Sequence, residues 1–353
     1  MIMKEEIKNK KIVFSIIMYN AVSRLADLIE SLKALDYPQE LLEFVFVDNN
    51  SVDDSLLFVK NNLPQAKIIE NKENLGFATA NNQAYELAKK LQADYFFLLN
   101  DDTIIEKDCL NQLVKEIEKD DQVVAVQAKL LLHPQADLIN SYGNNLNFLG
   151  FGYCGSYKKK DQFGPSFEVP YPSGGACLLK MSALDKVGLF EDEFFMYHED
   201  VDLGWKLKLA GYKSVFSPSA VVYHKYNFKN SGFKYYYLER NRLLVLLKNY
   251  KLGTLIIFAP IFFFMELGIL VFALRGGWLK EKISGYFWLI KNFKLILLGR
   301  KKIKKIRKVK DQEILKLMCA KIDFEEVNNF LLKNIANPVL SLYLLLANKI
   351  IFW

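Results

Sequence analysis

The sequence predicts an α/β fold, with a mostly parallel sheet flanked by helices, followed by an apolar and amphipathic helical region. From residue 11 to about residue 225, short β-branched or aromatic runs alternate with segments whose apolar residues recur at helical spacing, which is typical of doubly wound sheets. After residue 250, the apolar run at 255–274 is long enough to cross a bilayer. We therefore expect one domain over residues 1–250 and a membrane-associated helical region over residues 251–353.

The expected elements follow one another in a regular order. Short apolar runs predict strands at 12–17, 44–47, 67–69, 95–99 and 220–223. Helical periodicity and capping residues predict helices at 22–35, after the polar run 51–54, and at 77–91. From 132 to 173, Gly, Asn, Pro and Tyr interrupt the pattern. We expect a long, partly ordered loop region there, which in compact domains is commonly functional.

Composition favours a cytoplasmic compartment for the first domain. The four cysteines of the 353-residue chain are scattered and form no CxxC pair, so we expect reduced thiols and neither a disulfide framework nor a zinc site. Residues 1–11 are rich in Lys and Glu and lack an apolar run, which is unlike a secretory signal.

The positive charge is concentrated in one segment. The net charge is +7, and eight cationic residues lie within 300–310, so the rest of the chain is nearly neutral and nucleic acid is not an expected partner. A single span at 255–274 would place this basic segment outside the cell, against the positive-inside bias. Two membrane arrangements remain open, a hairpin of 255–274 with 283–298 or helices lying in the interface. A helix packed on the soluble core is the third alternative.

Two carboxylates follow the most apolar predicted strand. Asn100, Asp101 and Asp102 come directly after residues 95–99, at the edge where open α/β sheets bind ligands. Carboxylates at this edge suit Mg²⁺ or Mn²⁺ holding a diphosphate, because hard cations share oxygen ligands with phosphates. A turn or helix cap is the alternative interpretation.

Further polar segments are expected at the same edge. Tyr19 and Asn20 end the first strand, Asp48 and Asn49 end the second, and Asn74 and Gly76 precede a helix. An Asp in this position can accept hydrogen bonds from a base or ribose, and Gly allows close backbone approach to a ligand. Each segment alone could be a turn or cap, but their recurrence at one edge favours a binding site.

An acidic cluster beside aromatic residues is the third candidate. In Glu199-Asp200-Val201-Asp202, the first and last carboxylates share a helix face. An ionised carboxylate at a sugar-binding site can serve as a general base, whereas an acidic helix N-terminus is the structural alternative. His224 ends a predicted strand in the same domain, and both a metal role and a structural role remain open.

Taken together, these residues resemble family 2 glycosyltransferases, which have the GT-A fold. The resemblance covers about residues 11–250 and depends on the order of seven segments: 15–20, 47–51, 74–78, 99–103, 173–176, 199–203 and 222–224. The nearest branch is the rhamnosyltransferase-like group, which is similar in its Asn-any-Asp metal motif and in the segment Tyr236-Tyr237-Leu238-Glu239-Arg240-Asn241-Arg242.

The resemblance implies a role for each candidate residue. Asp200 is implied as the catalytic base and Asp102 as the metal ligand, with His224 completing the metal shell. The donor nucleotide is implied to contact Tyr19, Asn20, Asp48, Asn49, Asn74, Gly76, Asn100 and Asp101. The donor and acceptor pocket is implied to include Gly174, Gly175, Ala176, Glu199 and Trp205. Two departures from the family pattern are Asn100, where Asp is usual, and His198, where an aromatic residue is usual.

The expected function is a metal-assisted, inverting transfer of a sugar from a dTDP-, UDP- or GDP-linked donor to a glycan or polyprenyl-linked acceptor. Rhamnose is one candidate sugar, and the expected location is the cytoplasmic face of the cell membrane. Two alternatives are a non-catalytic nucleotide-sugar or glycan-binding protein and a sugar-phosphate nucleotidyltransferase. The second would carry a Gly-rich basic loop after the first strand, where this chain has Met18-Tyr19-Asn20-Ala21-Val22-Ser23.

Overall fold

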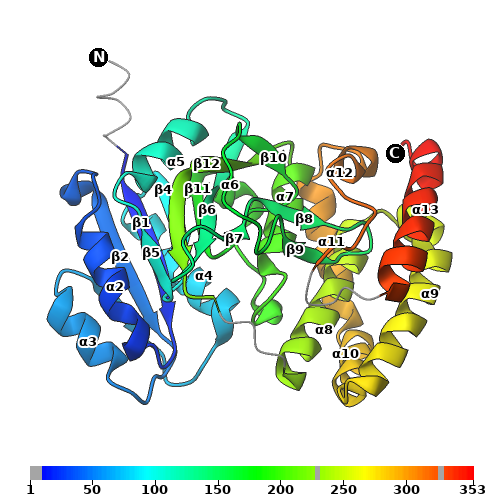
Figure 1. Ribbon diagram of the computed structural model, residues 1–353, viewed down its shortest axis with the longest axis horizontal. Coiled ribbons are helices and arrows are strands. Elements are labelled where there is room, and N and C mark those ends of the chain that lie inside the picture. The colour runs from blue at the N-terminus through cyan, green and yellow to red at the C-terminus, as the bar shows by residue number, and fades with distance from the viewer. Residues whose placement is uncertain (1–9, 227–230, 325–329) are drawn as a thin grey trace.

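A mixed sheet with helices on both faces forms the body of the protein. The computed structural model describes residues 10–226, 231–324 and 330–353. Figure 1 shows the sheet in one half of the molecule and the helices that follow residue 231 packed at the other end. The predicted α/β class with a C-terminal helical region is therefore confirmed.

Among the described residues, ten strands form the main sheet and two form a separate hairpin. The bounds are β1 Ile12–Met18, β2 Leu42–Asp48, β3 Lys67–Glu70, β4 Tyr95–Leu99, β5 Thr103–Ile105, β6 Val123–Leu132, β7 Ile139–Ser141, β8 Asn144–Leu146, β9 Gly152–Cys154, β10 Phe167–Val169, β11 Ala176–Lys180 and β12 Lys213–His224. The main order is β10-β12-β6-β11-β4-β1-β2-β3, with β5 beside β12 and β7 beside β6. Strands β1 to β4 run parallel, whereas β11 is antiparallel to both β4 and β6.

The helices cover both faces of this sheet and then form the end cluster (Figure 1). Their bounds are α2 Val22–Lys33, α3 Ser55–Asn62, α4 Gly76–Lys90, α5 Cys109–Ile117, α6 Met181–Val187, α7 Glu199–Leu209, α8 Gly232–Asn249, α9 Leu252–Arg275, α10 Leu279–Lys291, α11 Phe293–Ile306, α12 Asp311–Leu315 and α13 Asn337–Ile350, with short turns η1 Gln39–Leu41, η2 Asp192–Phe194 and η3 Leu332–Ala336.

The alternation of side chains along β1 divides the core into two parts. Phe14 and Ile16 face the helices α2, α3 and α5, and Val13 faces α4, α6 and α7. Successive side chains on a strand point to opposite faces, and both faces of β1 are buried. This explains why β1 is an uninterrupted apolar run and not an alternating one.

The predicted elements match the structure closely except in one segment. The strand 95–99 has the predicted bounds, and the other predicted strand runs lie within the observed strands. The expectation of a loop region over 132–173 is wrong, because β7 to β10 form there. β7 folds back onto the preceding strand β6, β8 pairs with β9, and only β10 joins a strand distant in sequence, β12. Strands of three residues carry too little periodic signal to be recognised.

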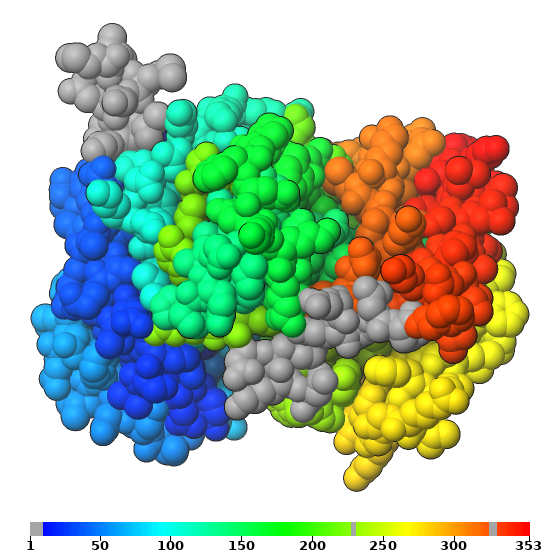
Figure 2. All heavy atoms as spheres, viewed as in Figure 1, coloured from blue at the N-terminus to red at the C-terminus, as the bar shows by residue number. Residues whose placement is uncertain are grey.

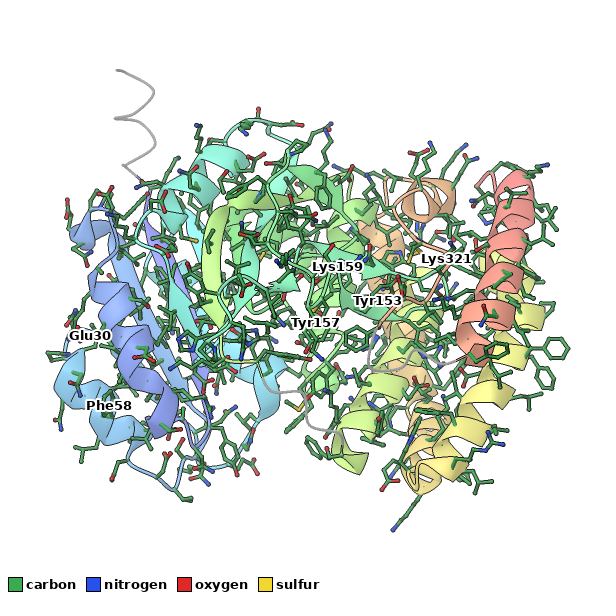
Figure 3. All side chains as sticks on the ribbon, in the orientation of Figure 1. Glu30, Phe58, Tyr153, Tyr157, Lys159 and Lys321 are labelled. Atoms are coloured by element: carbon green, nitrogen blue, oxygen red, sulfur yellow. The ribbon has the colours of Figure 1, made fainter. Side chains whose placement is uncertain are left out.

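The helices after residue 250 share a core with the α/β body. Apolar residues of α9 to α13 belong to the same buried cluster as those of β1 and β4. The segment after α12 also returns to the body: the Tyr153 hydroxyl donates to the carbonyl of Lys321 at 2.9 Å, and Figure 3 labels both residues. The predicted second apolar segment, 283–298, is divided at Asn292 between α10 and α11.

Helix α9 is the one described helix that is long and apolar enough to cross a bilayer. Its apolar side chains are largely exposed, and Figure 2 shows α9 and α13 at one end of the molecular surface. Near its middle, however, Glu266 is buried against α8 and α10. Its carboxylate accepts hydrogen bonds from Arg242 and Tyr286 and lies 2.7 Å from Lys282 Nζ. Glu239 completes this group of two carboxylates and two cations.

We expect Glu266→Gln to lower the free energy of unfolding by about 3–5 kcal/mol, because it leaves Arg242 and Lys282 with one carboxylate between two buried cations. Denaturant unfolding measures the change. The matched control is Glu313→Gln, which removes an exposed helical ion pair with Lys316 and is expected to change stability by less than about 0.5 kcal/mol. Equal effects of the two substitutions would show that the buried group does not hold α9 in place.

Candidate active site

The polar segments predicted at one edge do meet there. Because β1, β2 and β4 are parallel neighbours, their carboxyl ends lie at the same edge of the sheet. Asp48 is paired with Met18 in this register, and Asn100 follows β4 directly. The antiparallel strand β11 begins beside them, and the Gly175 carbonyl accepts a hydrogen bond from Asn100 N at 3.0 Å.

Asn20 and Asp48 shape the two loops after β1 and β2. The Asn20 backbone is left-handed, with φ of 50°, and its side-chain oxygen accepts a hydrogen bond from Val52 N at 2.9 Å. The Asp48 carboxylate accepts from Ser51 N at 3.3 Å. Tyr19 directly precedes Asn20 and is 49% exposed, so its ring is available to a ligand.

The turn before α4 is closely packed. Asn74 Oδ1 accepts from Gly76 N at 2.9 Å, and Asn49 Nδ2 donates to the Gly76 carbonyl at 3.1 Å. Gly76 has φ of +79°, and a Cβ atom there would lie 2.5 Å from Phe195. Position 76 therefore requires glycine for both its backbone conformation and its contact with Phe195.

Asp102 and His224 face each other across the sheet edge. His224 Nε2 lies 3.0 Å from Asp102 Oδ1, yet this buried oxygen has no aligned hydrogen-bond donor. On the other side of the ring, His224 Nδ1 lies 2.9 Å from Asn140 Oδ1. In the tautomer whose Nδ1–H donates to Asn140, the Nε2 lone pair faces the carboxylate, an arrangement that suits a shared cation.

The adjacent carboxyl group, Asp101, is paired with a residue that the sequence analysis missed. Arg24 Nη2 donates to Asp101 Oδ2 at 2.6 Å. Burial raises the pKa of Asp101 to about 6, against the opposing effect of Arg24. Burial also acts to raise the pKa of Asp102, but contact with His224 and the charge of Arg24 outweigh it and lower that pKa. The only sequence signal for Arg24 is its position one helical turn after Asn20.

The segment 174–176 joins the Asn100 region to Asp200. Gly174 N donates to Asp200 Oδ2 at 3.3 Å, and a Cβ at Gly175 would lie 3.6 Å from Asn100 Nδ2. Ala176 is buried and pairs with Leu99. The backbone of residues 174–176, which were predicted to line the pocket, therefore links the Asn100–Asp102 segment to Asp200.

Asp200 and Glu199 have different electrostatic environments. Burial raises the pKa of Asp200 to about 6, while the N–H groups of Gly174 and Val201 act to lower it. Burial and the charge of Asp200 raise the pKa of Glu199 well above its usual range, and its Oε2 has no hydrogen-bond partner. Of the two carboxyl groups, Asp200 is therefore the one that more readily gives up its proton.

The loop before Asp200 is strained and held by α8. Phe195, Tyr197 and His198 all have positive φ angles, a conformation that costs energy for residues other than glycine. Asn241 Nδ2 donates to the carbonyls of residues 194, 196 and 197 at 2.7–2.9 Å. Arg240 donates to the carbonyls of residues 193 and 194. Arg240 and Asn241, the Arg-Asn pair of the segment 236–242, therefore fix the backbone of this loop.

One prediction about α7, the role of Trp205, is corrected by the structure. Trp205 is 1% exposed and packs edge-on against Tyr250, so it belongs to the core and does not line an acceptor pocket. Asp202 is also buried, 2.6 Å from Lys248 Nζ. The third carboxylate of the 199–202 cluster therefore serves in a buried ion pair. His198 Nε2 donates a hydrogen bond to the carbonyl oxygen of Gly150, 3.1 Å away, and burial lowers the pKa of His198 to about 4.

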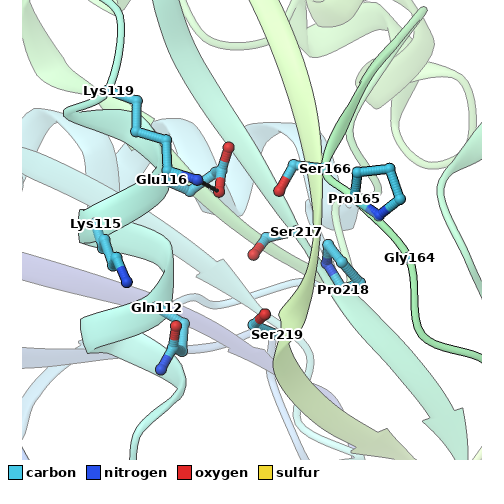
Figure 4. A pocket seen from close by; sticks show the side chains of 10 residues that line it. All are labelled: Gln112, Lys115, Glu116, Lys119, Gly164, Pro165, Ser166, Ser217, Pro218 and Ser219. Carbon is cyan, nitrogen blue, oxygen red and sulfur yellow. Dashed lines mark hydrogen bonds and ion pairs between the residues drawn. The ribbon is translucent and has the colours of Figure 1, made fainter.

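A separate polar cavity of about 460 Å³ lies between α5 and β12. Figure 4 shows Lys115 and Lys119 on one side of it and Ser217 and Ser219 on the other. None of the candidate site residues lines this cavity. Lys119 is already paired with Glu116, so we assign no ligand to it.

The fold and the acidic edge of the sheet define a glycosyltransferase of the GT-A type. Residues 14–188, about half of the chain, match the family described as glycosyl transferase family 2. The chain belongs to this family, and the predicted enzyme class is confirmed.

Known relatives agree with this assignment. Poly-beta-1,6-N-acetyl-D-glucosamine synthase of Staphylococcus aureus (strain COL) is 24% identical over 214 residues, which cover 60% of this chain and 49% of the relative. The chain thus spans about half the length of the curated relatives that it matches.

Solved structures share the fold at low sequence identity. GalNAc-T7 with UDP, GalNAc and Mn²⁺ has a TM-score of 0.55 at 16% identity, covering 67% of this chain and 47% of that one. S. aureus TarS 1–349 has 0.52 at 16%, covering 96% and 88%. The mannosyltransferase PcManGT from Pyrobaculum calidifontis, in complex with GDP-Man and Mn²⁺, has 0.50 at 16%, covering 98% and 87%.

We expect Asn241→Leu to lower the rate of sugar transfer by about 100-fold, because the loop before Asp200 loses its three side-chain hydrogen bonds and the Asp200 carboxylate is displaced. Nucleotide affinity, measured by calorimetry, is expected to stay within about threefold, because the loops after β1 and β2 are untouched. Asn62→Leu, on the exposed end of α3, is the control. An equal loss of nucleotide binding in Asn241→Leu would mean general unfolding.

Proposed function

We propose that this protein transfers a sugar from a nucleotide-diphosphate sugar to a hydroxyl group of a glycan or lipid-linked acceptor, with inversion, in cell-surface polysaccharide synthesis. The observation that carries this proposal is the position of Asp200. Its carboxylate is held by two backbone N–H groups and is joined through Gly174 and Gly175 to the Asn100–Asp102 segment. A base and a diphosphate site are the two parts that a single displacement requires.

Asp200 is the general base of this proposal. It accepts the proton of the acceptor hydroxyl while the oxygen forms a bond to the anomeric carbon. The bond from that carbon to the diphosphate oxygen breaks at the same time, and the nucleoside diphosphate leaves with the electron pair. Glu199, whose pKa is raised by burial and by the charge of Asp200, and the backbone of Gly174, Gly175 and Ala176 form the adjoining pocket wall.

The donor nucleotide lies along the loops after β1 and β2 in this proposal. Asp48 and Asn20 orient the loop backbones, Tyr19 offers an exposed ring, and the turn at Asn74 and Gly76 lies next to Asn49. The compared structures are named with UDP, UDP-GlcNAc and GDP-Man. The donor proposed here is a dTDP-, UDP- or GDP-linked sugar, with rhamnose as one candidate.

The residues at the sheet edge fit a divalent metal. Asp102 Oδ1 is buried without an aligned donor and faces a histidine nitrogen at 3.0 Å. Among the described residues, no three acidic, histidine or cysteine side chains converge on one point, which suits Mg²⁺ or Mn²⁺ completed by phosphate oxygens and water. We propose Asp102 and His224 as ligands, beside Asn100 and Asp101. When bound, the ion would offset the charge on the diphosphate.

We also propose that residues 1–250 carry the reaction and residues 251–353 attach it to the cytoplasmic face of the membrane. The exposed apolar side chains of α9, α11 and α13 support this attachment. The pairing of Glu266 with α8 and α10 favours helices that lie in the interface over a hairpin that enters the bilayer, because insertion would separate these buried charges.

We expect one nucleotide sugar in a panel of dTDP-, UDP- and GDP-linked donors to be consumed by the wild type and not by Asp200→Asn. Because burial raises the pKa of Asp200 to about 6, its carboxylate is protonated below that pH and cannot accept a proton. The turnover rate is therefore expected to fall about tenfold per pH unit below pH 6 and to level off above it. Binding of a donor without turnover by any acceptor would instead favour a binding protein.

We expect Asp102→Ala and His224→Ala each to weaken Mn²⁺ binding in the presence of the nucleoside diphosphate, by about 10- to 100-fold. Electron paramagnetic resonance of free Mn²⁺ measures the affinity without relying on activity. Asp53→Ala, on the loop before α3, is the control carboxylate. Unchanged Mn²⁺ affinity in both variants would contradict the assignment of these ligands.

A further inference from the structure

A basic cavity lies at the junction of α8, α9 and α11. It has a volume of about 390 Å³, and six of the ten residues that line it are cationic, with no carboxylate among them. The cationic residues are Lys248, Lys251, Arg300, Lys301, Lys304 and Arg307. The inner wall of the cavity is itself mostly apolar, so the cationic groups that an anion could meet are those that border it.

Most of this charge is not neutralised by the protein. Lys248 is paired with Asp202, and Arg307 Nη1 lies 2.5 Å from Asp311 Oδ1. Arg300 donates only to backbone carbonyls among its described hydrogen bonds. In the described parts of the chain, no carboxylate forms an ion pair with any of the other three, which are Lys251, Lys301 and Lys304.

The surface around the cavity is apolar. Leu252 and Ile256, at the start of α9, are 65% and 64% exposed, and Leu297 and Leu298 of α11 are 50% and 56% exposed. Neighbouring apolar side chains add nothing to the binding of an anion that is free in solution. They strengthen the binding of an anionic group at the surface of a bilayer, because apolar side chains beside it can enter the acyl boundary.

Helix α11 is held flat against the body with its charges at one end. Its buried residues Ile296, Gly299 and Ile303 follow one another at helical spacing. A Cβ at Gly299 would lie 2.6 Å from the Lys248 side chain, so α11 and α8 are in close contact. Apart from Lys294, the first half of the exposed face is apolar, and the second half carries Lys301 and Lys304.

We propose that this cavity binds the phosphate of an anionic membrane-lipid headgroup, while the neighbouring apolar side chains of α9 and α11 enter the acyl boundary. Lysine and arginine side chains are attracted to anionic lipid surfaces, and here they also surround a space that can hold one headgroup. The inference deepens the membrane attachment proposed above and rests on it. It does not depend on the donor, the acceptor or the chemistry of transfer.

The test measures binding of the full chain to sedimented phosphatidylcholine vesicles, with and without phosphatidylglycerol. We expect the wild type to bind the anionic vesicles more tightly, and Lys301→Gln/Lys304→Gln to lower that affinity about 10- to 30-fold. The matched control is Lys305→Gln/Lys308→Gln, which removes the same charge from the same basic segment outside the cavity and is expected to cost about threefold or less. Lys251→Gln provides an independent variant on α9.

Two further measurements separate the explanations. All variants are expected to keep wild-type thermal unfolding and wild-type transfer to a soluble acceptor, since none of these lysines lies in the active site. Calorimetry with inorganic pyrophosphate tests a soluble ligand. Equal losses of vesicle affinity in the two double variants would show that diffuse charge attraction, and not the cavity, accounts for binding. Pyrophosphate binding that depends on Lys301 and Lys304, without vesicle binding, would overturn the lipid headgroup as its occupant.

Discussion

The buried charges of α8 must be paired, and this requirement holds the rest of the structure together. Arg242 and Glu239 bind Glu266 and Lys282 of the C-terminal helices, and Lys248 binds Asp202 of α7. On the same helix, Asn241 holds the strained loop before Asp200. Separating an ion pair of this kind leaves a buried charge uncompensated. The loop before Asp200 and the proposed membrane-facing helices are thus fixed to one common element.

The acidic residues of α7 illustrate how position decides chemistry. Three carboxylates lie within four residues, yet each has a different environment. Asp202 is neutralised by lysine, Glu199 is buried with its Oε2 unpaired, and Asp200 receives two backbone N–H groups. Only Asp200 combines a charge at neutral pH with a position beside the edge of the sheet. The same logic separates Asp101, which is bound by Arg24, from Asp102, which faces His224.

Much of this arrangement can be predicted from the sequence, because the polar residues that follow parallel strands all lie at the same edge of the sheet. The strand 95–99 and the polar residues after it are adjacent in the chain, so their joint position at the edge follows from the fold class. The strands of 132–173 are not predicted because each has only three residues and carries too little periodic signal; β10 also pairs with a strand distant in sequence. Trp205 was assigned to a pocket because spacing alone does not distinguish a core face from a ligand face. Asn140 gave no signal, since its role depends on contact with His224.

The contact between Gly76 and Phe195 limits how the enzyme can change during evolution. The turn before α4 and the loop before α7 touch without room for a single methyl group, and Ala78 N also donates to the Phe195 carbonyl at 3.0 Å. Neither segment can acquire larger side chains at this contact without displacing the other. Drift in sugar or nucleotide preference would therefore have to begin at tolerant positions such as the exposed Tyr19, while the contact itself stays fixed.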